Sequence, residues 1–481
     1  MSTPNQLDEA IELHQKGELP QAAARYQEIL ENEPENADAW HLLGVVAHQQ
    51  DKNDLAARLI NNAIGLKEDV ADFHSNLGRV QIALGDEAAG DAAYRRAVEI
   101  NPHHVKALSN LAGLLRTTGQ FSAAVDYARR AVAAGPDDPE AQINLGNALK
   151  DINWTDDAVA AYTRAIELAP DYALAHWNLS LALLTLGQYE TGFKEMMWRW
   201  RWGGFPAKAR DFEAPQLQPG DDISGKRILL HAEQGIGDTL HFIRYAEQLR
   251  KQGAHVIFEC PGAVRPLIEG ADLTDDLVAA GDGLPKFDLH AALLDLPYIC
   301  RTSQDTLPQA TPYLTIPFEI SNKWQTKVAS EPGLKIGLNW AGNPESPVEH
   351  FRGLPPADLL PLAALENVTW FSLQKGNNAN DVPALSDNFP ILDTGPDALI
   401  ETAGLIQALD LIITSDTAIA HLAGALNKPV WILLHHAPDW RWLTEGDKSA
   451  WYPSARLFRQ RQPGGWKSVI EEVLTALKNS L

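Results

Sequence analysis

Cysteine and positive charge are both scarce in this sequence. Only Cys260 and Cys300 occur in 481 residues, which excludes a disulfide framework or a metal cluster built from cysteine and indicates a reducing compartment. Lysine and arginine total 40 against 63 aspartates and glutamates, for a net charge of −23. General electrostatic attraction to nucleic acid needs a basic face, so we expect no nucleic-acid partner.

Long apolar runs are also absent. The first six residues are polar and lack the apolar core of a signal peptide. The most apolar helical stretch, residues 173–187, contains His176, Asn178 and Ser180 and is too short and too polar to span a bilayer. These absences predict a cytoplasmic protein without a membrane span. At about 150 residues per domain, the length suggests about three domains.

The sequence does contain a repeat of 34 residues, the length of the tetratricopeptide helix–turn–helix unit. Its columns hold asparagines (Asn76, Asn110, Asn144, Asn178), small residues (Gly44, Gly78, Ala112, Gly146, Ser180) and prolines that end helices (Pro34, Pro102, Pro136, Pro170). They define units at 3–36, 37–70, 71–104, 105–138, 139–172 and 173–206. We therefore predict an α solenoid over residues 1–206.

The asparagine column has two interpretations. Its residues stand on the first helix of each unit, which commonly lines the concave face of such an array. Because an amide both donates and accepts, a row of asparagines can bind a polypeptide whatever its side chains. Alternatively, asparagine is simply frequent at this position and bonds within its own repeat. The second unit has Leu42 in this column, so any row starts in the third.

The pattern changes after the repeats. The run Trp198–Trp202 alternates tryptophan with arginine and predicts a seam between the last helix and the next domain, with sugar stacking as an alternative. Residues 211–225 are rich in proline, glycine and aspartate, and a linker is predicted at 207–225. Beyond them, apolar runs alternating with amphipathic stretches predict α/β domains with parallel sheets at 226–325 and 326–481. The predicted strands are 227–231, 255–259, 335–340, 369–373, 411–414 and 429–434, with a helix over 238–252.

A glycine loop follows the first predicted strand. Gly235 and Gly237 allow a tight turn into a helix, whose N-terminus suits an anion. A dinucleotide fingerprint would need a third glycine where Leu240 stands, which disfavours such a cofactor. Asp238, at the carboxyl end of a strand, is a candidate general base, with a helix cap as the alternative.

A second anion site is predicted after strand 411–414. The helix of the segment 415–425 would offer free N–H groups near Thr417 and Ala418 to a diphosphate. His421 is one turn further on the same face, although a buried structural histidine is the alternative. Loops at 341–343, 374–376 and 435–437 follow other strands and would open on the same edge, with Arg352 and Lys375 as cations for phosphate.

These motifs carry a family resemblance. Residues 226–466 resemble the glycosyltransferase family 9, or heptosyltransferase-like, enzymes of the GT-B fold, and the whole chain resembles bacterial proteins that join tetratricopeptide repeats to such a domain. The resemblance implies that Asp238 is the base for the acceptor hydroxyl, that Asp416, Thr417 and His421 hold the donor's phosphates, and that no metal is needed. The stretches that carry it are 187–193, 198–200, 232–240, 340–344, 372–374, 415–425 and 438–443.

The chain departs from the family's pattern in two places. Segment 348–353 keeps only Arg352 of an Asp-Arg-x-Arg-Ser motif, and His435-His436 replaces a proline–aromatic pair. The predicted fold class is thus an α solenoid followed by a GT-B type pair of Rossmann-like domains. The predicted donor-binding residues are Gly235, Gly237, Thr239, His241, Asn343, Arg352, Gln374, Lys375, Asp416, Thr417, Ala418 and His421, and the acceptor-binding residues are Asn76, Asn110, Asn144 and Asn178.

Together these features predict a metal-independent, inverting glycosyltransferase that moves a sugar from a nucleotide-sugar to a Ser or Thr hydroxyl of a protein. The nucleotide-sugar is a substrate, and no cofactor is expected. Two alternatives remain: a transferase acting on a glycan or lipid precursor, and a non-enzymatic scaffold with a decayed transferase domain. The nucleotide, the acceptor, the oligomeric state and the choice among hexosyl, heptosyl and nonulosonate transfer stay open.

Overall fold

The computed structural model describes residues 6–346, 349–376, 380–386, 389–393 and 398–479. The chain forms two compact units, Met1–Ala175 and His176–Leu481. The division falls inside helix α11 (Ala173–Thr185), so most of the sixth predicted repeat belongs to the second unit. Among the described helices, none is both long enough and apolar enough to cross a membrane.

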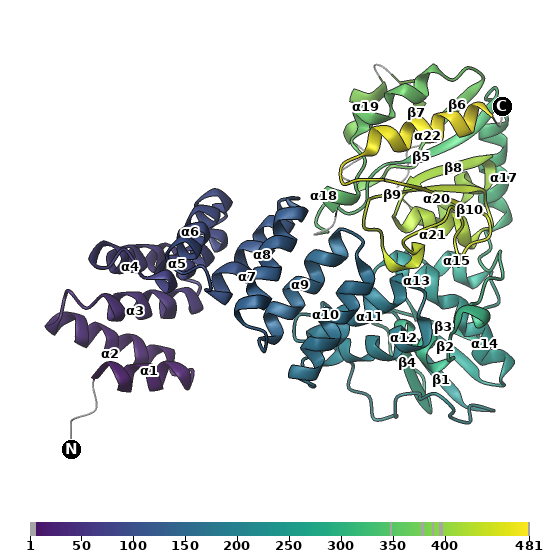
Figure 1. Ribbon diagram of the computed structural model, residues 1–481. Helices are drawn as coiled ribbons and strands as arrows, with labels where there is room; N and C mark the ends of the chain where they lie inside the picture. Colours follow the sequence, from purple (N-terminus) through teal and green to yellow (C-terminus); the bar gives the residue numbers. More distant parts are fainter. Residues whose placement is uncertain (1–5, 347–348, 377–379, 387–388, 394–397, 480–481) are drawn as a thin grey trace. The chain divides into compact units, whose positions relative to one another are not determined.

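The first unit consists of antiparallel helix pairs (Figure 1). First helices of successive repeats begin at Ala37, Ala71, Val105 and Pro139, each 34 residues after the last, which confirms the predicted register. The helices are α1 (Gln6–Gln15), α2 (Leu19–Asn32), α3 (Ala37–Gln49), α4 (Asn53–Leu66), α5 (Ala71–Ala83), α6 (Glu87–Ile100), α7 (Val105–Thr117), α8 (Phe121–Ala134), α9 (Pro139–Asp151) and α10 (Thr155–Leu168).

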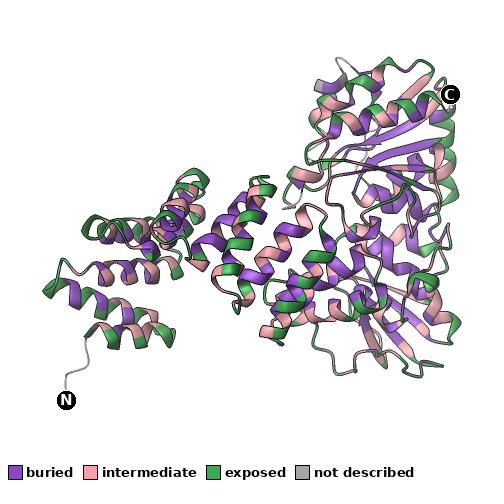
Figure 2. Cartoon of the chain, viewed as in Figure 1, coloured by how far each residue is buried: buried purple, intermediate pink, exposed green. Residues whose placement is uncertain are grey.

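Small residues let the two helices of a repeat approach closely, and the buried residues lie on their facing sides (Figure 2). A Cβ on Gly78 would lie 2.6 Å from the ring of Tyr94, and one on Gly146 would lie 2.4 Å from the ring of Tyr162. In these two repeats the tyrosine ring of the second helix therefore fills the space that the glycine leaves.

The second unit contains two parallel sheets (Figure 1). The first has strand order β3-β2-β1-β4 and the second β10-β9-β8-β5-β6-β7. The strands are β1 (Arg227–His231), β2 (His255–Cys260), β3 (Asp276–Ala279), β4 (Leu289–Ala292), β5 (Leu334–Asn339), β6 (Val368–Ser372), β7 (Ile391–Leu392), β8 (Leu411–Ser415), β9 (Val430–Leu434) and β10 (Ala455–Arg459). Each of the six predicted strands is present within one residue at either end, whereas β3, β4, β7 and β10 were not predicted.

Helices surround and connect these strands. The predicted helix 238–252 is instead three pieces beginning at Ile236, with a 3-10 turn in the middle where Arg244 Nε bonds the carbonyl of His241 at 2.8 Å. The α-helices of this unit after α11 are α12 (Tyr189–Met196), α13 (Ile236–Phe242), α14 (Ala246–Lys251), α15 (Arg265–Glu269), α16 (Leu296–Ile299), α17 (Phe318–Ala329), α18 (Glu349–Arg352), α19 (Asp381–Ser386), α20 (Leu399–Ala408), α21 (Ala418–Ala425) and α22 (Trp466–Lys478). Short 3-10 segments are η1 (Met197–Arg201), η2 (Ile243–Tyr245), η3 (Leu293–Asp295), η4 (Gln304–Thr306), η5 (Pro356–Ala364) and η7 (Trp440–Trp442).

The two sheets share one hydrophobic core, which includes Ile228 of β1 and Ile432 of β9. A buried arginine crosses the junction: Arg244 Nη1 donates to the carbonyls of Trp451 at 3.0 Å and Pro308 at 2.9 Å. The same guanidinium donates through Nη2 to the hydroxyl of Tyr313 at 2.8 Å. Apolar packing and a buried cation thus join the two halves of this unit.

The close packing within the repeats can be tested with two glycines. Gly146→Ala should lower the free energy of unfolding by about 1–3 kcal/mol, because its Cβ would overlap the Tyr162 ring. Gly113→Ala in α7 should raise it by up to about 1 kcal/mol, because no heavy atom lies within 4 Å of the added Cβ and alanine favours helix. Urea unfolding of the full chain, followed by circular dichroism, compares the two variants, and a stabilising Gly146→Ala would contradict this packing.

Candidate active site

A cavity of about 1050 Å³ opens between the two sheets of the second unit. The glycine loop after β1 lines one side, and the segments after β5, β6 and β8 line the other. The carboxyl ends of parallel strands are the usual ligand-binding edge of such sheets. Of the predicted site residues in this unit, those that line the cleft are Gly235, Gly237, Asp238, Asn343, Arg352, Gln374, Lys375, Asp416, Thr417, Ala418 and His421.

Asp238 lies in the first turn of α13, and its side chain is 23% exposed. Its Oδ1 accepts a hydrogen bond from Nη2 of Arg441 at 2.5 Å, across 203 residues of sequence. Burial raises the pKa of Asp238 above its usual value, the Arg441 guanidinium opposes that rise, and Asp439 adds to it. Asp238 is therefore a carboxylate held in one orientation at the wall of the cleft.

Arg441 is a site residue that the sequence did not point to. It lies in η7, is buried, donates from Nη1 to Asp439 Oδ1 at 2.9 Å, and stacks on the Trp440 ring with 4.3 Å between guanidinium and centroid. Asp238 and Asp439 offset the charge of this buried guanidinium, and both carboxylates line the cleft. The tryptophans on either side of Arg441 in the sequence were the available signal for its burial.

Helices α13 and α21 pack against each other and bring the two sides of the cleft together. A Cβ on Gly237 would lie 3.1 Å from Cδ2 of His421 and 3.6 Å from Cα of Ala418. The absence of a side chain at residue 237 therefore permits this close approach. His421 itself is buried, and its Nδ1 is 3.0 Å from the hydroxyl of Tyr452.

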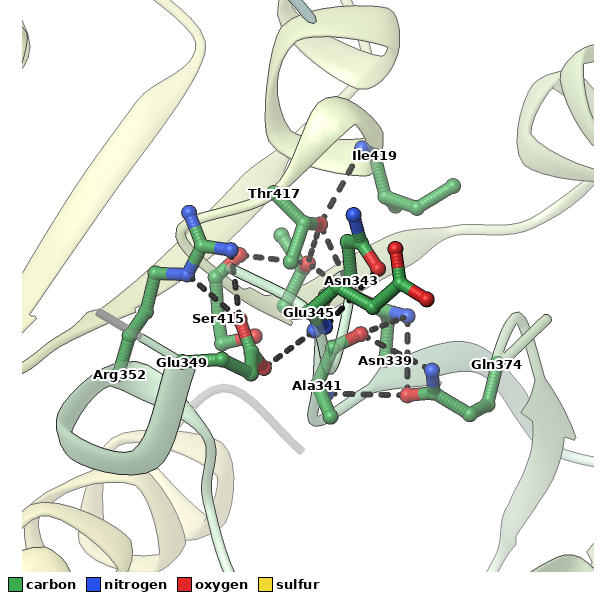
Figure 3. Close-up of polar contacts among 12 residues, drawn as sticks. Asn339, Ala341, Asn343, Glu345, Glu349, Arg352, Gln374, Ser415, Thr417 and Ile419 are labelled. Atoms are coloured by element: carbon green, nitrogen blue, oxygen red, sulfur yellow. Dashed lines mark hydrogen bonds and ion pairs between the residues drawn. The ribbon is translucent and has the colours of Figure 1, made fainter. Parts of the chain in front are cut away.

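The N-terminus of α21 is fixed by a network of hydroxyl and amide groups (Figure 3). Thr417 is its N-cap and accepts from the N–H of Ile419 at 3.3 Å. Its hydroxyl donates to Asn339 Oδ1 at 2.9 Å, and Thr414 donates to the same oxygen at 3.1 Å. The ends of β5 and β8 are thereby tied to the start of α21, where unpaired N–H groups favour an anion.

Gln374 uses its amide to hold the loop after β5 (Figure 3). Its Oε1 accepts from the N–H groups of Trp340 at 3.1 Å and Ala341 at 3.0 Å and from Asn339 Nδ2 at 3.1 Å. Its Nε2 donates to the carbonyl of Ala341 at 2.9 Å. Gln374 therefore shapes the wall of the cleft, and its amide is already occupied within the protein.

Arg352 also has a protein partner (Figure 3). Glu349 Oε2 accepts from its Nε at 3.0 Å and from its Nη2 at 2.5 Å, while Glu349 Oε1 accepts from the N–H of Gly342 at 2.6 Å. A phosphate that bound Arg352 would compete with this carboxylate. The departure from the family's motif in segment 348–353 can be followed only from Glu349 onwards, because Val348 is outside the described residues.

Two acidic residues, Asp416 and Asp439, lie on the side of the cleft that the second sheet forms. Burial raises the pKa of Asp416 to about 6, with Asp439 adding to the rise and Arg352 opposing it. Both carboxyls line the cavity, together with Arg352, Arg441 and Lys375. The cleft therefore combines cations with carboxylates and does not form a uniformly positive pocket.

Thr239 and His241 are not among the residues that line the cleft. The hydroxyl of Thr239 donates to the carbonyl of Gly235 at 3.1 Å, within its own helix. His241 is buried, with its Nδ1 2.9 Å from the hydroxyl of Tyr452. Both residues stabilise the packing of α13 beneath the site, so a direct donor contact does not fit their positions.

Three of the predicted acceptor-binding asparagines lie around a separate cavity of about 400 Å³ in the first unit. Asn76, Asn110 and Asn144 line it together with charged side chains that include Arg79 and Glu140. Asn76 Nδ2 also donates to Nε2 of His41 at 2.8 Å, a bond to the preceding repeat and not within its own repeat as the alternative interpretation expected. Asn178 belongs to the second unit, so it is not placed with the other three.

Comparison with known proteins finds matches to family models in both parts of the chain. Models of the tetratricopeptide repeat match residues 7–71, 75–139 and 146–187. The model of glycosyltransferase family 9 (heptosyltransferase) matches residues 377–439, a range that contains Asp416, Thr417 and His421. The chain joins tetratricopeptide repeats to a glycosyltransferase family 9 domain. This domain makes it an enzyme of the glycosyltransferase class.

One relative spans nearly the whole of this glycosyltransferase. Protein FlbA of Caulobacter vibrioides is 25% identical over 475 residues, which cover 93% of this chain and 73% of FlbA. Solved structures similar to part of the chain include MamA, with 20% identity, a TM-score of 0.30 and coverage of 35% of this chain and 92% of that one. Another is PilW, with 23% identity, a TM-score of 0.36 and coverage of 40% and 88%.

Asp416 should make the protein less stable at neutral pH than an uncharged residue would. Its pKa of about 6 is above the usual 3.8, so its ionisation opposes folding increasingly as pH rises between those values and fully above pH 6. Asp416→Asn should raise the free energy of unfolding at pH 8 by about 1–3 kcal/mol and change it little at pH 3.5.

Denaturant titrations at the two pH values measure this difference. The matched control is Asp282→Asn, an exposed aspartate of the same unit, which should leave the free energy of unfolding unchanged at both. A loss of stability in Asp416→Asn at pH 8 would show that ionised Asp416 is well compensated in the folded protein.

Proposed function

We propose that the chain is an inverting, metal-independent glycosyltransferase that moves a sugar from a nucleotide-sugar to a Ser or Thr hydroxyl of a protein. The observation that carries the proposal is the position of Asp238. Its carboxylate lines a cleft whose other wall is formed by the start of α21 and by arginine side chains. A base and an anion-binding surface on one cavity suit displacement of a nucleotide by a hydroxyl group.

In the proposed step, the acceptor oxygen bonds to the anomeric carbon while that carbon's bond to the donor phosphate oxygen breaks. The hydroxyl proton passes to the carboxylate of Asp238, and the electron pair of the broken bond leaves with the phosphate. A single displacement of this kind inverts the anomeric configuration. The bond from Arg441 to Asp238 Oδ1 keeps the base in place and favours its ionised form.

The leaving phosphate would be stabilised by groups on the opposite wall. The N–H groups at the start of α21 supply partial positive charge. Arg352 and Lys375 line the same cavity, and Arg352 would exchange its Glu349 partner for phosphate oxygens. The protein groups of the cleft thus provide positive charge where negative charge develops, which is the reason for proposing that no metal ion is required.

The protein acceptor is proposed from the repeats. Tetratricopeptide repeats suggest binding of another protein, and the cavity lined by Asn110 and Asn144 offers amides with flanking charges. A segment of extended polypeptide presents backbone donors and acceptors that amides can bind irrespective of sequence. The repeats would then select the acceptor, and the transferase domain would act on its hydroxyl groups.

Nucleotide release tests the reaction. The full chain is incubated with UDP-, ADP-, GDP- and CMP-sugars in the presence of EDTA, and we expect turnover of one donor class, with water replacing the acceptor hydroxyl. Asp238→Asn should reduce that rate by at least about 100-fold, because it removes the base, and should leave the melting temperature within a few degrees of the wild type.

Asp282→Asn, which alters an exposed aspartate outside the cleft, should keep the wild-type rate. Wild-type turnover by Asp238→Asn would remove the proposed base. A rate that EDTA abolishes and Mg²⁺ restores would instead remove the metal-independent reaction.

The role of the repeats needs a different assay. Asn110→Ala combined with Asn144→Ala should reduce transfer of labelled sugar to polypeptides of a cell extract by about 10-fold, because two amide contacts are lost, while nucleotide release in the absence of acceptor stays unchanged. The control is Asn62→Ala, an exposed asparagine of α4 outside the cavity. Undiminished transfer by the double variant would exclude these asparagines from acceptor binding.

A further inference from the structure

Arg199 is a buried arginine that lies between two buried carboxylates. It belongs to η1, and its side chain is 0% exposed. Its Nη2 donates to Oε1 of Glu233 at 2.9 Å and to Oδ1 of Asp295 at 2.5 Å. The exposed fractions of these two acidic side chains are 2% and 1%. Arg199 belongs to the run Trp198–Trp202, which was predicted to form a seam between the last repeat helix and the next domain. The contacts of Arg199 confirm that this run has a structural role.

The two carboxylates come from different parts of the chain. Glu233 lies in the loop after β1, two residues before Gly235, and its Oε1 also accepts from the N–H of Leu294 at 3.1 Å. Asp295 ends η3 and accepts from Nε1 of Trp200 at 3.3 Å and from Nε2 of Gln216 at 2.8 Å. Arg199 therefore ties the segment that follows α12 to the glycine loop and to the end of η3.

The position of Glu233 depends on this arginine for electrostatic reasons. Burial raises the pKa of Glu233 to about 7, Asp295 adds to the rise, and Arg199 opposes it. Without Arg199, Glu233 and Asp295 would be two buried acidic groups that lose the guanidinium between them. Buried charges that lose their partner are strongly destabilised, so Glu233 would move towards solvent or become protonated, and its loop would shift with it.

We propose that Arg199 is a positioning residue for the transfer reaction: it fixes Glu233 and thereby the glycine loop that leads into α13 and Asp238. The inference rests on the proposed role of Asp238 as the base. Arg199 and Glu233 are not among the residues that line the cleft, whereas Gln234 to Asp238 do line it. Arg199 thus acts through the backbone, and a displacement of about 1 Å at the reacting group costs on the order of 100-fold in rate.

Arg199 also lies close in sequence to the last helices of the repeat pattern. It follows α12, the last helix in phase with the repeats, by only three residues. The neighbouring Trp198 stacks on His176 of α11, with 3.8 Å between ring centroids. One short segment therefore packs against the final helices of the repeat pattern and fixes the catalytic loop.

Arg199→Lys tests the proposal, because lysine keeps the charge but cannot reproduce the guanidinium bonds to both acids. The matched control is Arg201→Lys, which changes an exposed arginine of the same segment that stacks on Trp198. The first measurement is amide hydrogen exchange of the peptide covering residues 234–238 in the full chain. We expect faster exchange in Arg199→Lys and no change in Arg201→Lys.

The second measurement is nucleotide release at pH 8 from the activated sugar that the donor panel identifies. Arg199→Lys should lower kcat by about 10-fold and change KM for the donor by less than twofold, because the nucleotide-binding wall is untouched. In an Asp238→Asn background the same change should lower kcat by less than twofold, since groups acting as a unit are not additive. A folding defect alone would reduce the fraction of active enzyme, and would therefore lower the apparent kcat by the same factor in both backgrounds.

The possible outcomes separate this inference from the proposed function. Unchanged exchange at residues 234–238, or a wild-type kcat in Arg199→Lys, would overturn the positioning role even if Asp238→Asn is inactive. An active Asp238→Asn would instead remove the proposed base, whatever Arg199 does. If Arg199→Lys does not fold, Glu233→Gln retains the size of the side chain but loses the charge, and a wild-type exchange rate and kcat in that variant would equally overturn the role.

Discussion

The packing of α13 against α21 is the constraint on which the site depends. The first helix brings Asp238 to the cleft and the second supplies its own N-terminus, so neither half forms the site without the other. The approach is possible because residue 237 is a glycine facing the ring of His421. The hydroxyl of Tyr452 lies beside both His241 and His421, which joins the two helices through a third segment.

The charged groups of the cleft are largely paired with one another. Asp238 and Asp439 share Arg441, and Glu349 holds Arg352. In a chain with a net charge of −23, these pairs keep cations next to the cavity that the proposed anionic donor would enter. Binding would exchange one set of ion pairs for another, and the acidic partners would limit how strongly a phosphate is held.

The sequence was sufficient for features set by local periodicity. The repeat register was predicted to the residue because every 34-residue unit obeys the same packing rule, as Gly78 and Gly146 show. Strands with clear apolar runs, such as β1, were also predicted. By contrast, β3 and β7 are short, with four and two residues, and provide too little pattern to recognise.

The part of the site that escaped prediction depends on contacts between distant segments. Arg441 meets Asp238 across 203 residues, and Arg199 meets Asp295 across 96, so no local spacing could reveal either pair. Thr239 shows a second reason why the sequence did not predict the site correctly, which is the direction of a side chain on its helix. It follows Asp238 by one residue, which is about 100° around a helix, and its side chain therefore faces the interior while that of Asp238 faces the cleft.

The buried cation Arg244 restricts how a ligand can enter. Swinging the two sheets apart would strip this guanidinium of the carbonyl of Trp451 and would expose the apolar core that both sheets share. Displacing surface segments such as 342–346, which are partly or fully exposed, would break fewer buried contacts than separating the sheets. Substrate entry and product exit should therefore proceed by local rearrangement at the rim of the cleft, with the two sheets remaining together throughout the catalytic cycle.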